Sequence, residues 1–256
     1  MLDNQPLSIS GATKADFLFY PGFFNPNQGF RLTEWRRHSP EEIINILNNQ
    51  RTRSHNQHVL AITSCHDDRW ESYSGQSTDI PMLCVGRLTW LIHTRVIQAD
   101  YQGERVDMNV ILPQDDTDIR KIQPREKPLS YVVDAANSSG GVVCLCSSPN
   151  AELASELYDQ RRDSIDVIES YRWEHNTLTD RKGLAVSGSH NPKNMFQSST
   201  LFTSHPIPDP ESIRSTLKQH NFSPIYHTKP SLRRNLARLK LGMNTAESLA
   251  RSKIGL

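Results

Sequence analysis

Apolar and polar residues alternate along two stretches near the middle of the chain, on either side of a turn at Gln102-Gly103. Alternation indicates half-buried strands, because successive side chains of a strand point to opposite faces of the sheet. The apolar positions are Leu88, Trp90, Ile92 and Val96 in the first stretch and Val106, Met108, Val110 and Leu112 in the second. The polar positions between them include His93, Arg95, Asp107 and Asn109. The pattern predicts an antiparallel hairpin over about 88–112, with one face of each strand in the core.

A second pair of strands is predicted over about 129–146. The apolar segments LSYVVDA and GGVVCLC are separated there by ANSSGG, which favours a flexible connection. Because the run Val142–Cys146 does not alternate, we expect that strand to be buried on both faces.

Three segments carry the start signals of helices. HSPEEIINILNN begins with a Ser-Pro pair at residues 39–40, and DPESIRSTLKQHNF begins with an Asp-Pro pair at residues 209–210. In both, the first residue is a good N-cap and proline suits the first helical position. The longest helix is predicted over 148–178, with Ser148 or Asn150 as its cap.

Near its end, the chain repeats a heptapeptide, LARLKLG at 236–242 and LARSKIG at 249–255. In each copy the apolar residues form one stripe at helical spacing, basic residues occupy the other faces, and glycine ends the helix. We predict a basic helical hairpin within residues 229–256. Helices this short are not stable alone in water, so they must pack on each other, on the body or on a partner.

The net charge of the 256 residues is only +1, but the charge is unevenly distributed. Residues 1–228 hold 22 Lys and Arg against 27 Asp and Glu, whereas residues 229–256 hold seven basic residues and one acid. The seven are Lys229, Arg233, Arg234, Arg238, Lys240, Arg251 and Lys253. A basic helical pair on an acidic body suits contacts with nucleic-acid phosphates. The alternative is that the basic side docks on the acidic body or on an acidic protein.

Together the elements predict an α+β fold with an antiparallel sheet core, flanking helices and the basic C-terminal hairpin. The predicted divisions are an α+β body at 1–186, a Ser/Pro-rich loop or linker at 187–210, and a helical C-terminal region at 211–256.

Few motifs in the chain carry chemistry, and the phosphate-cradling, dinucleotide-binding, zinc-protease and nucleophile-elbow motifs are all missing. The densest polar cluster, Cys65–Glu71, could supply metal ligands or an acid–base pair, but a solvated loop is the plainer interpretation. Cys146 precedes a predicted helix start, which would favour a reactive thiol, whereas its apolar neighbours favour a buried structural one. The spacing of the four cysteines fits neither a zinc knuckle nor a disulfide framework. We therefore expect no metal and no cofactor.

The sequence favours a nucleic-acid-binding protein of the non-catalytic kind, a regulator or a subunit of a nucleoprotein assembly, that contacts DNA or RNA through its basic C-terminal helices. One alternative is a hydrolase or transferase that uses Cys65–Glu71 or Cys146. Another is a structural or adaptor subunit that docks a protein partner. The start MLDNQPLSIS lacks the features of a secretion signal, and no window is apolar enough to span a bilayer. We therefore expect a cytoplasmic protein without a membrane partner.

Overall fold

The fold was analysed in a computed structural model of the 256-residue chain. The structure describes residues 13–17, 22–24, 35–37, 40–50, 57–64, 70–75, 80–86, 89–146, 150–170, 183–186, 196, 198–202 and 209–226. All statements below concern these residues.

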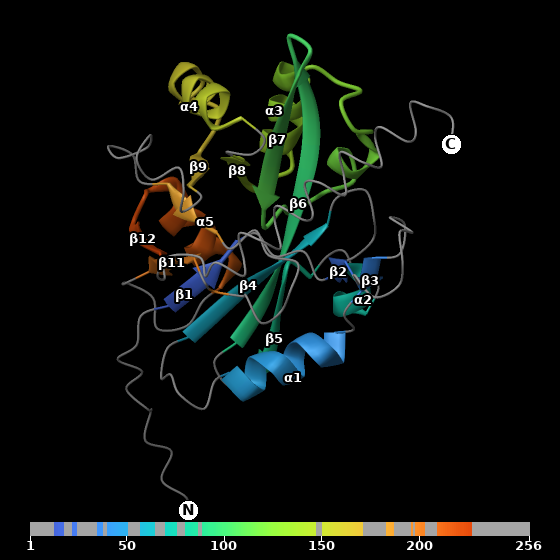
Figure 1. The fold of residues 1–256 in the computed structure, drawn as a ribbon, viewed down its shortest axis with the longest axis vertical. Helices are drawn as coiled ribbons and strands as arrows, with labels where there is room; N and C mark the ends of the chain where they lie inside the picture. Colours follow the sequence, from blue (N-terminus) through green and yellow to red (C-terminus); the bar gives the residue numbers. More distant parts are fainter. Residues whose placement is uncertain are drawn as a thin grey trace, which may run out of the picture. The chain divides into compact units, whose positions relative to one another are not determined.

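A large mixed sheet forms the centre of the described chain (Figure 1). The strands in chain order are β1 (Thr13–Asp16), β2 (Gly22–Phe24), β3 (Trp35–Arg37), β4 (Gln57–Ser64), β5 (Met82–Gly86), β6 (Thr89–Tyr101), β7 (Glu104–Ile111), β8 (Val142–Leu145), β9 (Val167–Ser170), β10 (Leu184–Ala185), β11 (Ser198–Phe202) and β12 (Phe222–Tyr226). Ten of them belong to the sheet, in the order β10-β9-β8-β7-β6-β4-β1-β11-β12, with β5 paired to β6. β2 and β3 pair only with each other among the described strands.

The pairing directions make the sheet mixed rather than antiparallel. β1 is parallel to β4 and β4 to β6, and β8 is parallel to β9 and β9 to β10. β7 lies antiparallel between β6 and β8, so β8 runs in the same direction as β6. The six strands that share this direction are β1, β4, β6, β8, β9 and β10. At the far ends of the order, β10 lies against β11 and β12, and Thr200 Oγ1 donates a 3.2 Å hydrogen bond to the Ala185 carbonyl. The sheet therefore curls into a nearly closed, barrel-like form.

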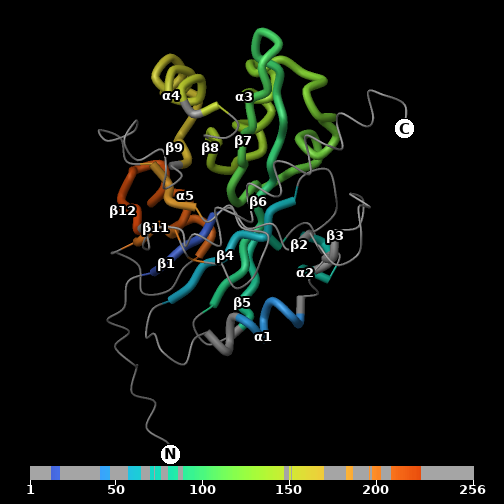
Figure 2. Tube along the Cα trace, viewed as in Figure 1, coloured from blue at the N-terminus to red at the C-terminus, as the bar shows by residue number. Residues whose placement is uncertain are grey.

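Helices are few and short. They are α1 (Pro40–Gln50), α2 (Glu71–Ser74), the 3₁₀ helix η3 (Ile119–Lys121), α3 (Leu129–Ser138), α4 (Ala151–Gln160) and α5 (Pro210–Lys218). The tube in Figure 2 shows α3 beside the upper part of the long β6–β7 hairpin and α1 across the lower strands.

Apolar side chains fill the inner face of the curled sheet and cover parts of its outer face. The inner cluster takes alternate residues from the strands, such as Val59, Val96 and Ile111, together with Ile213 and Leu217 of α5. On the outer face, α3 and α4 cover β6 to β8, and α1 packs on β4 and β6. Both faces of the central strands are therefore buried.

α5 lies at the amino ends of β8 and β9. The guanidinium of its Arg214 donates to the Leu112 carbonyl at 3.0 Å, and Lys218 approaches Asp166, just before β9, at 3.9 Å. Apolar residues of α5 thus close the interior at the end opposite to the carboxyl ends of these strands.

The predicted fold class is wrong, because the core is this barrel-like mixed sheet and not an antiparallel sheet. The predicted hairpin is present as β6 and β7, with Val96 paired to Asn109. The predicted strand at the start of 129–146 is instead α3, while the second is β8. Leu129, Val132, Val133 and Ala136 are all buried on one side of α3, a spacing of three and four residues that outweighs the strand preference of two adjacent valines.

The long helix predicted over 148–178 is also wrong. α4 ends at Gln160, and Val167–Ser170 turns into strand β9. The predicted helix starts are confirmed: Asn150 Oδ1 accepts from Leu153 N–H at 3.1 Å, and Asp209 Oδ1 accepts from Ser212 N–H at 2.9 Å. Part of the Ser/Pro-rich range, Ser198–Phe202, forms β11. The predicted C-terminal helical hairpin, 229–256, lies outside the described residues, and a separate unit begins at His227.

Candidate functional site

A row of polar side chains crosses three neighbouring strands at the carboxyl ends of β8 and β9. Asp107 of β7 pairs with Cys146, whose N–H donates to the Asp107 carbonyl at 2.9 Å. The register of β8 and β9, with Cys144 beside Val167, then places Cys146 next to Glu169. Since Cys144 and Val167 belong to the inner cluster, residues two further along point inward as well. We call Asp107, Cys146 and Glu169 the polar rung.

The polar rung is buried but reaches the surface at one end. Glu169 is fully buried, whereas the Asp107 side chain keeps 12% of its surface exposed. The half-exposed guanidinium of Arg105 binds the Asp107 carboxylate with two nitrogens, Nε at 2.6 Å and Nη2. A bidentate pair of this kind fixes the orientation of the carboxylate.

The thiols of Cys146, in the polar rung, and of the neighbouring Cys144 are held in their protonated form. Burial raises the pKa of Cys146 well above its usual value, and the nearby charge of Glu169 raises it further. Burial and Glu169 act in the same direction on the pKa of Cys144. These shifts oppose a thiolate nucleophile at Cys146, so the carboxylates are the reactive groups that this position favours.

Asn109 lies one step deeper on the same face as Asp107. Its Nδ2 donates at 2.9 Å to the carbonyl of Phe17, the residue that follows β1. β6 and β4 separate β7 from β1 in the sheet, so this bond crosses the interior. The side chain is fully buried, and its Oδ1 accepts no hydrogen bond from the residues that the structure describes.

A second polar network lies on the outer face of β6. Arg95 donates to Asp116 from Nε at 2.9 Å, and both residues are buried. The buried His93 imidazole stacks on Trp70, with ring centroids 5.4 Å apart and planes 6° apart. Burial, with the positive charges of Arg95 and then Arg120, lowers the pKa of His93 from 6.5 to about 3. This histidine is therefore neutral at physiological pH.

Glu71 joins that network, since its carboxylate forms an ion pair with Arg120. At the end of β4, Ser64 Oγ accepts from the Trp70 N–H at 3.1 Å. Glu71 and the other members of the network thus bind one another, which is the pattern of a structural network more than of a ligand site.

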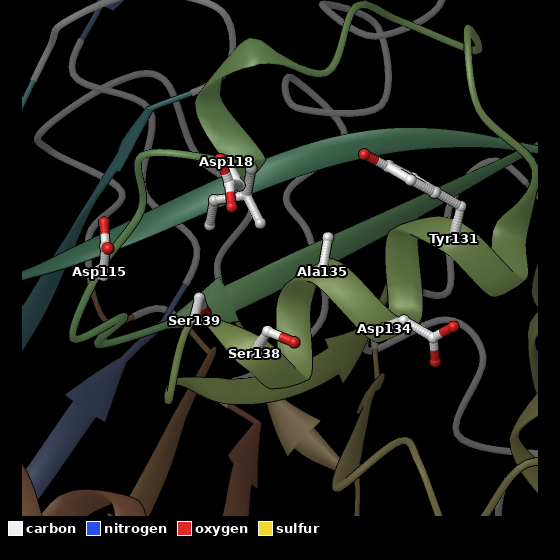
Figure 3. A pocket seen from close by; sticks show the side chains of 8 residues that line it. Asp115, Asp118, Tyr131, Asp134, Ala135, Ser138 and Ser139 are labelled. Atoms are coloured by element: carbon white, nitrogen blue, oxygen red, sulfur yellow. The ribbon is translucent and has the colours of Figure 1, made fainter.

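A cleft of about 360 Å³ lies between the segment after β7 and α3. Figure 3 shows its carboxylates, Asp115, Asp118 and Asp134, spread along the cleft rather than converging on one point. Across the described part of the chain, no group of three or more His, Cys, Asp or Glu could hold a metal ion.

Most of the candidate site residues predicted from the sequence lie outside the residues that the structure describes. The seven basic residues of the tail and Cys65–Arg69 all lie outside the described residues. Of the Cys65–Glu71 cluster only Trp70 and Glu71 are described, and the segment begins directly after the carboxyl end of β4. Cys146 is the one sequence candidate that belongs to the polar rung.

The sequence reasoning missed the other members of the polar rung. Alternation placed Asp107 and Asn109 on a polar face, but in a closed sheet both faces are buried. Glu169 was hidden in the predicted long helix. The signal that could have found it is the apolar run around it, Ile165, Val167 and Ile168, which fits a buried strand better than an amphipathic helix.

The fold is similar to those of two solved structures. One is the lesion-specific endonuclease PfuEndoQ from Pyrococcus furiosus, with a TM-score of 0.55, 14% identity, and coverage of 83% of this chain and 57% of that one. The other is PsfC from Pseudomonas syringae PB-5123, with a TM-score of 0.53, 9% identity, and coverage of 92% of this chain and 99% of that one. This chain therefore spans little more than half the length of the endonuclease. No protein-family model and no curated protein matches the chain.

These findings correct the function expected from the sequence. That expectation required an α+β body whose activity was limited to binding through a C-terminal helical pair. The observed fold is instead one that a solved endonuclease shares, which overturns the interpretation as a non-catalytic regulator or nucleoprotein subunit. Within the described residues, no helix is both long and apolar enough to cross a membrane.

Proposed function

We propose that the chain is a hydrolase that cleaves phosphodiester bonds of nucleic acid, with Glu169 of the polar rung as its general base. The observation that carries the proposal is the polar rung itself, with a buried Glu169 beside Cys146 and Asp107 on the other side of Cys146, at the carboxyl ends of β8 and β9. The similarity of the fold to that of a lesion-specific endonuclease supports nucleic acid as the substrate class.

The position of the polar rung supports an active site. In barrels and sheets built of parallel strands, catalytic groups come from the carboxyl ends of the strands and the loops that follow them. The opposite end of the interior is filled by apolar residues of α5. Cys65–Glu71 follows the carboxyl end of β4, so a contribution of His66, Asp67 or Asp68 to the same site stays a prediction from the sequence.

In the proposed reaction Glu169 accepts a proton from a water molecule while the water oxygen bonds to phosphorus. The bond between phosphorus and the leaving ester oxygen breaks, and that oxygen takes up a proton. Solvent water supplies this proton, because Arg105 binds Asp107 as a carboxylate with two nitrogens and leaves it no proton to give. Glu169 is then the acid–base group of the reaction. Acid–base groups of this kind typically contribute about 100- to 10,000-fold to a rate.

The test is hydrolysis of labelled single-stranded DNA, duplex DNA and RNA, each with EDTA, Mg²⁺ or Mn²⁺. Wild type should cleave at least one substrate, and Glu169→Gln should lower kcat by about 100-fold or more. Glu211→Gln is the matched control, since Glu211 is exposed on α5, at the end of the interior opposite to the polar rung. Its kcat should equal that of wild type. Equal activity of Glu169→Gln and wild type, or no cleavage of any substrate, would refute the proposal.

The seven basic residues at 229–253 remain candidates for contacts to substrate phosphates. Such contacts would strengthen binding without taking part in bond breaking, so their loss should raise KM and leave kcat unchanged. An adaptor role for the tail, without hydrolysis, would leave both constants unchanged.

A further inference from the structure

Asn109 is a polar side chain in the interior that no step above requires. It is fully buried, and only one half of its amide is used: Nδ2 donates to the Phe17 carbonyl at 2.9 Å. Oδ1 accepts no hydrogen bond from the described residues. A buried acceptor without a partner destabilises the folded state, and native proteins keep few of them.

The bond to Phe17 fixes which way the amide faces. Phe17 follows the carboxyl end of β1, across the interior from β7. With Nδ2 committed to that carbonyl, Oδ1 is held on the other side of the amide plane. Asp107 is the next residue of β7 that points inward on the side of the carboxyl ends of β8 and β9, and it is a member of the polar rung. Below Asn109 the inner face is apolar, with Ile111, Val142 and the α5 residues.

Asn109 thus marks the boundary between the apolar interior and the polar rung. The residues paired with Asn109 on the two neighbouring strands, β6 and β8, do not donate a hydrogen bond to Oδ1. Cys144, paired with Asn109, points its thiol towards the Leu145 carbonyl at 3.9 Å, and Val96 on the other side is apolar. A water molecule can satisfy an acceptor in such a place, because buried waters bind polar groups that the protein leaves unsatisfied.

We infer that Asn109 Oδ1 holds a water molecule beside the polar rung, and that this water is the one that Glu169 activates. The inference rests on the proposed function for its second half only. The water donates one O–H to Asn109 Oδ1, which leaves its second O–H for the carboxylate and a lone pair for phosphorus. Asn109 is a positioning residue in this scheme, since it orients the attacking oxygen and takes no proton.

The experiment uses full-length Asn109→Leu and Asn109→Asp. Both lose the amide donor to Phe17, but only Asp keeps an acceptor oxygen at this position. Asn109→Leu should lower kcat by about 100-fold with KM nearly unchanged, because a misplaced nucleophile costs about that factor. Asn109→Asp should recover kcat to within about tenfold of wild type, since its carboxylate can still orient water.

The two variants separate positioning from stability. Asn109→Asp should melt at a lower temperature than Asn109→Leu, because a buried carboxylate faces the Phe17 carbonyl. Activity and stability should therefore rank the variants in opposite orders. Thr94→Val is the control. Thr94 lies on β6 and faces the interior, as Asn109 does on β7, and its hydroxyl donates to Thr63 Oγ1 at 3.1 Å. It should leave kcat within about threefold of wild type, as loss of a neutral hydrogen bond away from the reaction does. Matching orders of activity and stability would overturn the inference.

A crystal structure of wild type gives a readout that does not depend on activity. It should show an ordered water within about 2.7–3.2 Å of Asn109 Oδ1, and Asn109→Leu should lack it. A protein donor bound to Oδ1 instead would overturn the inference even in an active enzyme. If wild type cleaves no substrate but the water is present, the proposed function fails while the water site stands.

Discussion

Acidification below pH 6.5 should destabilise the fold through one residue, His93. Its imidazole is 2% exposed, stacked on Trp70 and close to two arginines, so the folded protein excludes a proton that the unfolded chain binds readily. The folded pKa is about 3 against an unfolded value of 6.5. Because the folded pKa is the lower one, the unfolded state binds more protons between these values. Stability is complete above pH 6.5 and falls as the pH drops towards 3.

The magnitude follows from the difference in pKa. At pH 5 the unfolded histidine is almost fully protonated and the folded one is neutral, which destabilises the fold by about 2 kcal/mol. The result changes little if the folded pKa of His93 is one unit higher, since the group would still be neutral at pH 5. The loss approaches about 5 kcal/mol near pH 3.

Urea unfolding followed by tryptophan fluorescence at pH 8, 7, 6 and 5 measures this effect. His93→Gln cannot titrate, so its unfolding free energy should fall between pH 8 and pH 5 by about 2 kcal/mol less than that of wild type. The variant will be less stable at every pH because it loses the stack on Trp70, and only the difference in pH dependence is diagnostic. Parallel pH curves for the two proteins would refute the argument.

Three further outcomes are expected from the same structure. Asp116→Ala should lower the unfolding free energy by about 3–5 kcal/mol in urea titrations, because the buried Arg95 guanidinium loses this carboxylate. Asp209→Ala should cost only about 1 kcal/mol, measured in the same way, since it removes one helix cap. In a thiol-labelling time course read by mass spectrometry, the exposed Cys84 should react before the buried Cys144 and Cys146. Cys146 should stay unlabelled while the fold persists, because it is buried and its pKa is raised. Rapid labelling of Cys146 would restore it as a candidate nucleophile.

Local signals in the sequence predicted local structure well. The caps Asn150 and Asp209 bind the backbone as expected, because a short polar side chain before a helix satisfies an otherwise unpaired N–H wherever the helix packs. The β6–β7 hairpin was also predictable, since alternation and the turn at Gln102-Gly103 lie within one continuous stretch.

The closure of the sheet and the polar rung were not predictable from these signals. Parallel neighbours such as β4 and β6 lie far apart in the sequence and leave no pairing signal in one chain. Closure also buries both faces of β6 and β7, so polar residues that alternation assigns to solvent, such as Asn109, point into the interior. Glu169 becomes notable only when the register sets it beside Cys146.

One comparison tests most directly whether the chemistry resides in the barrel or in the tail. The proteins are full-length wild type, Glu169→Gln and the double variant Arg234→Glu/Arg238→Glu, assayed for kcat and KM on the substrate that wild type cleaves best. We predict that Glu169→Gln loses about 100-fold or more in kcat, whereas the double variant keeps kcat and raises only KM. A double variant with abolished kcat beside a fully active Glu169→Gln would contradict the assignment of the active site to the polar rung.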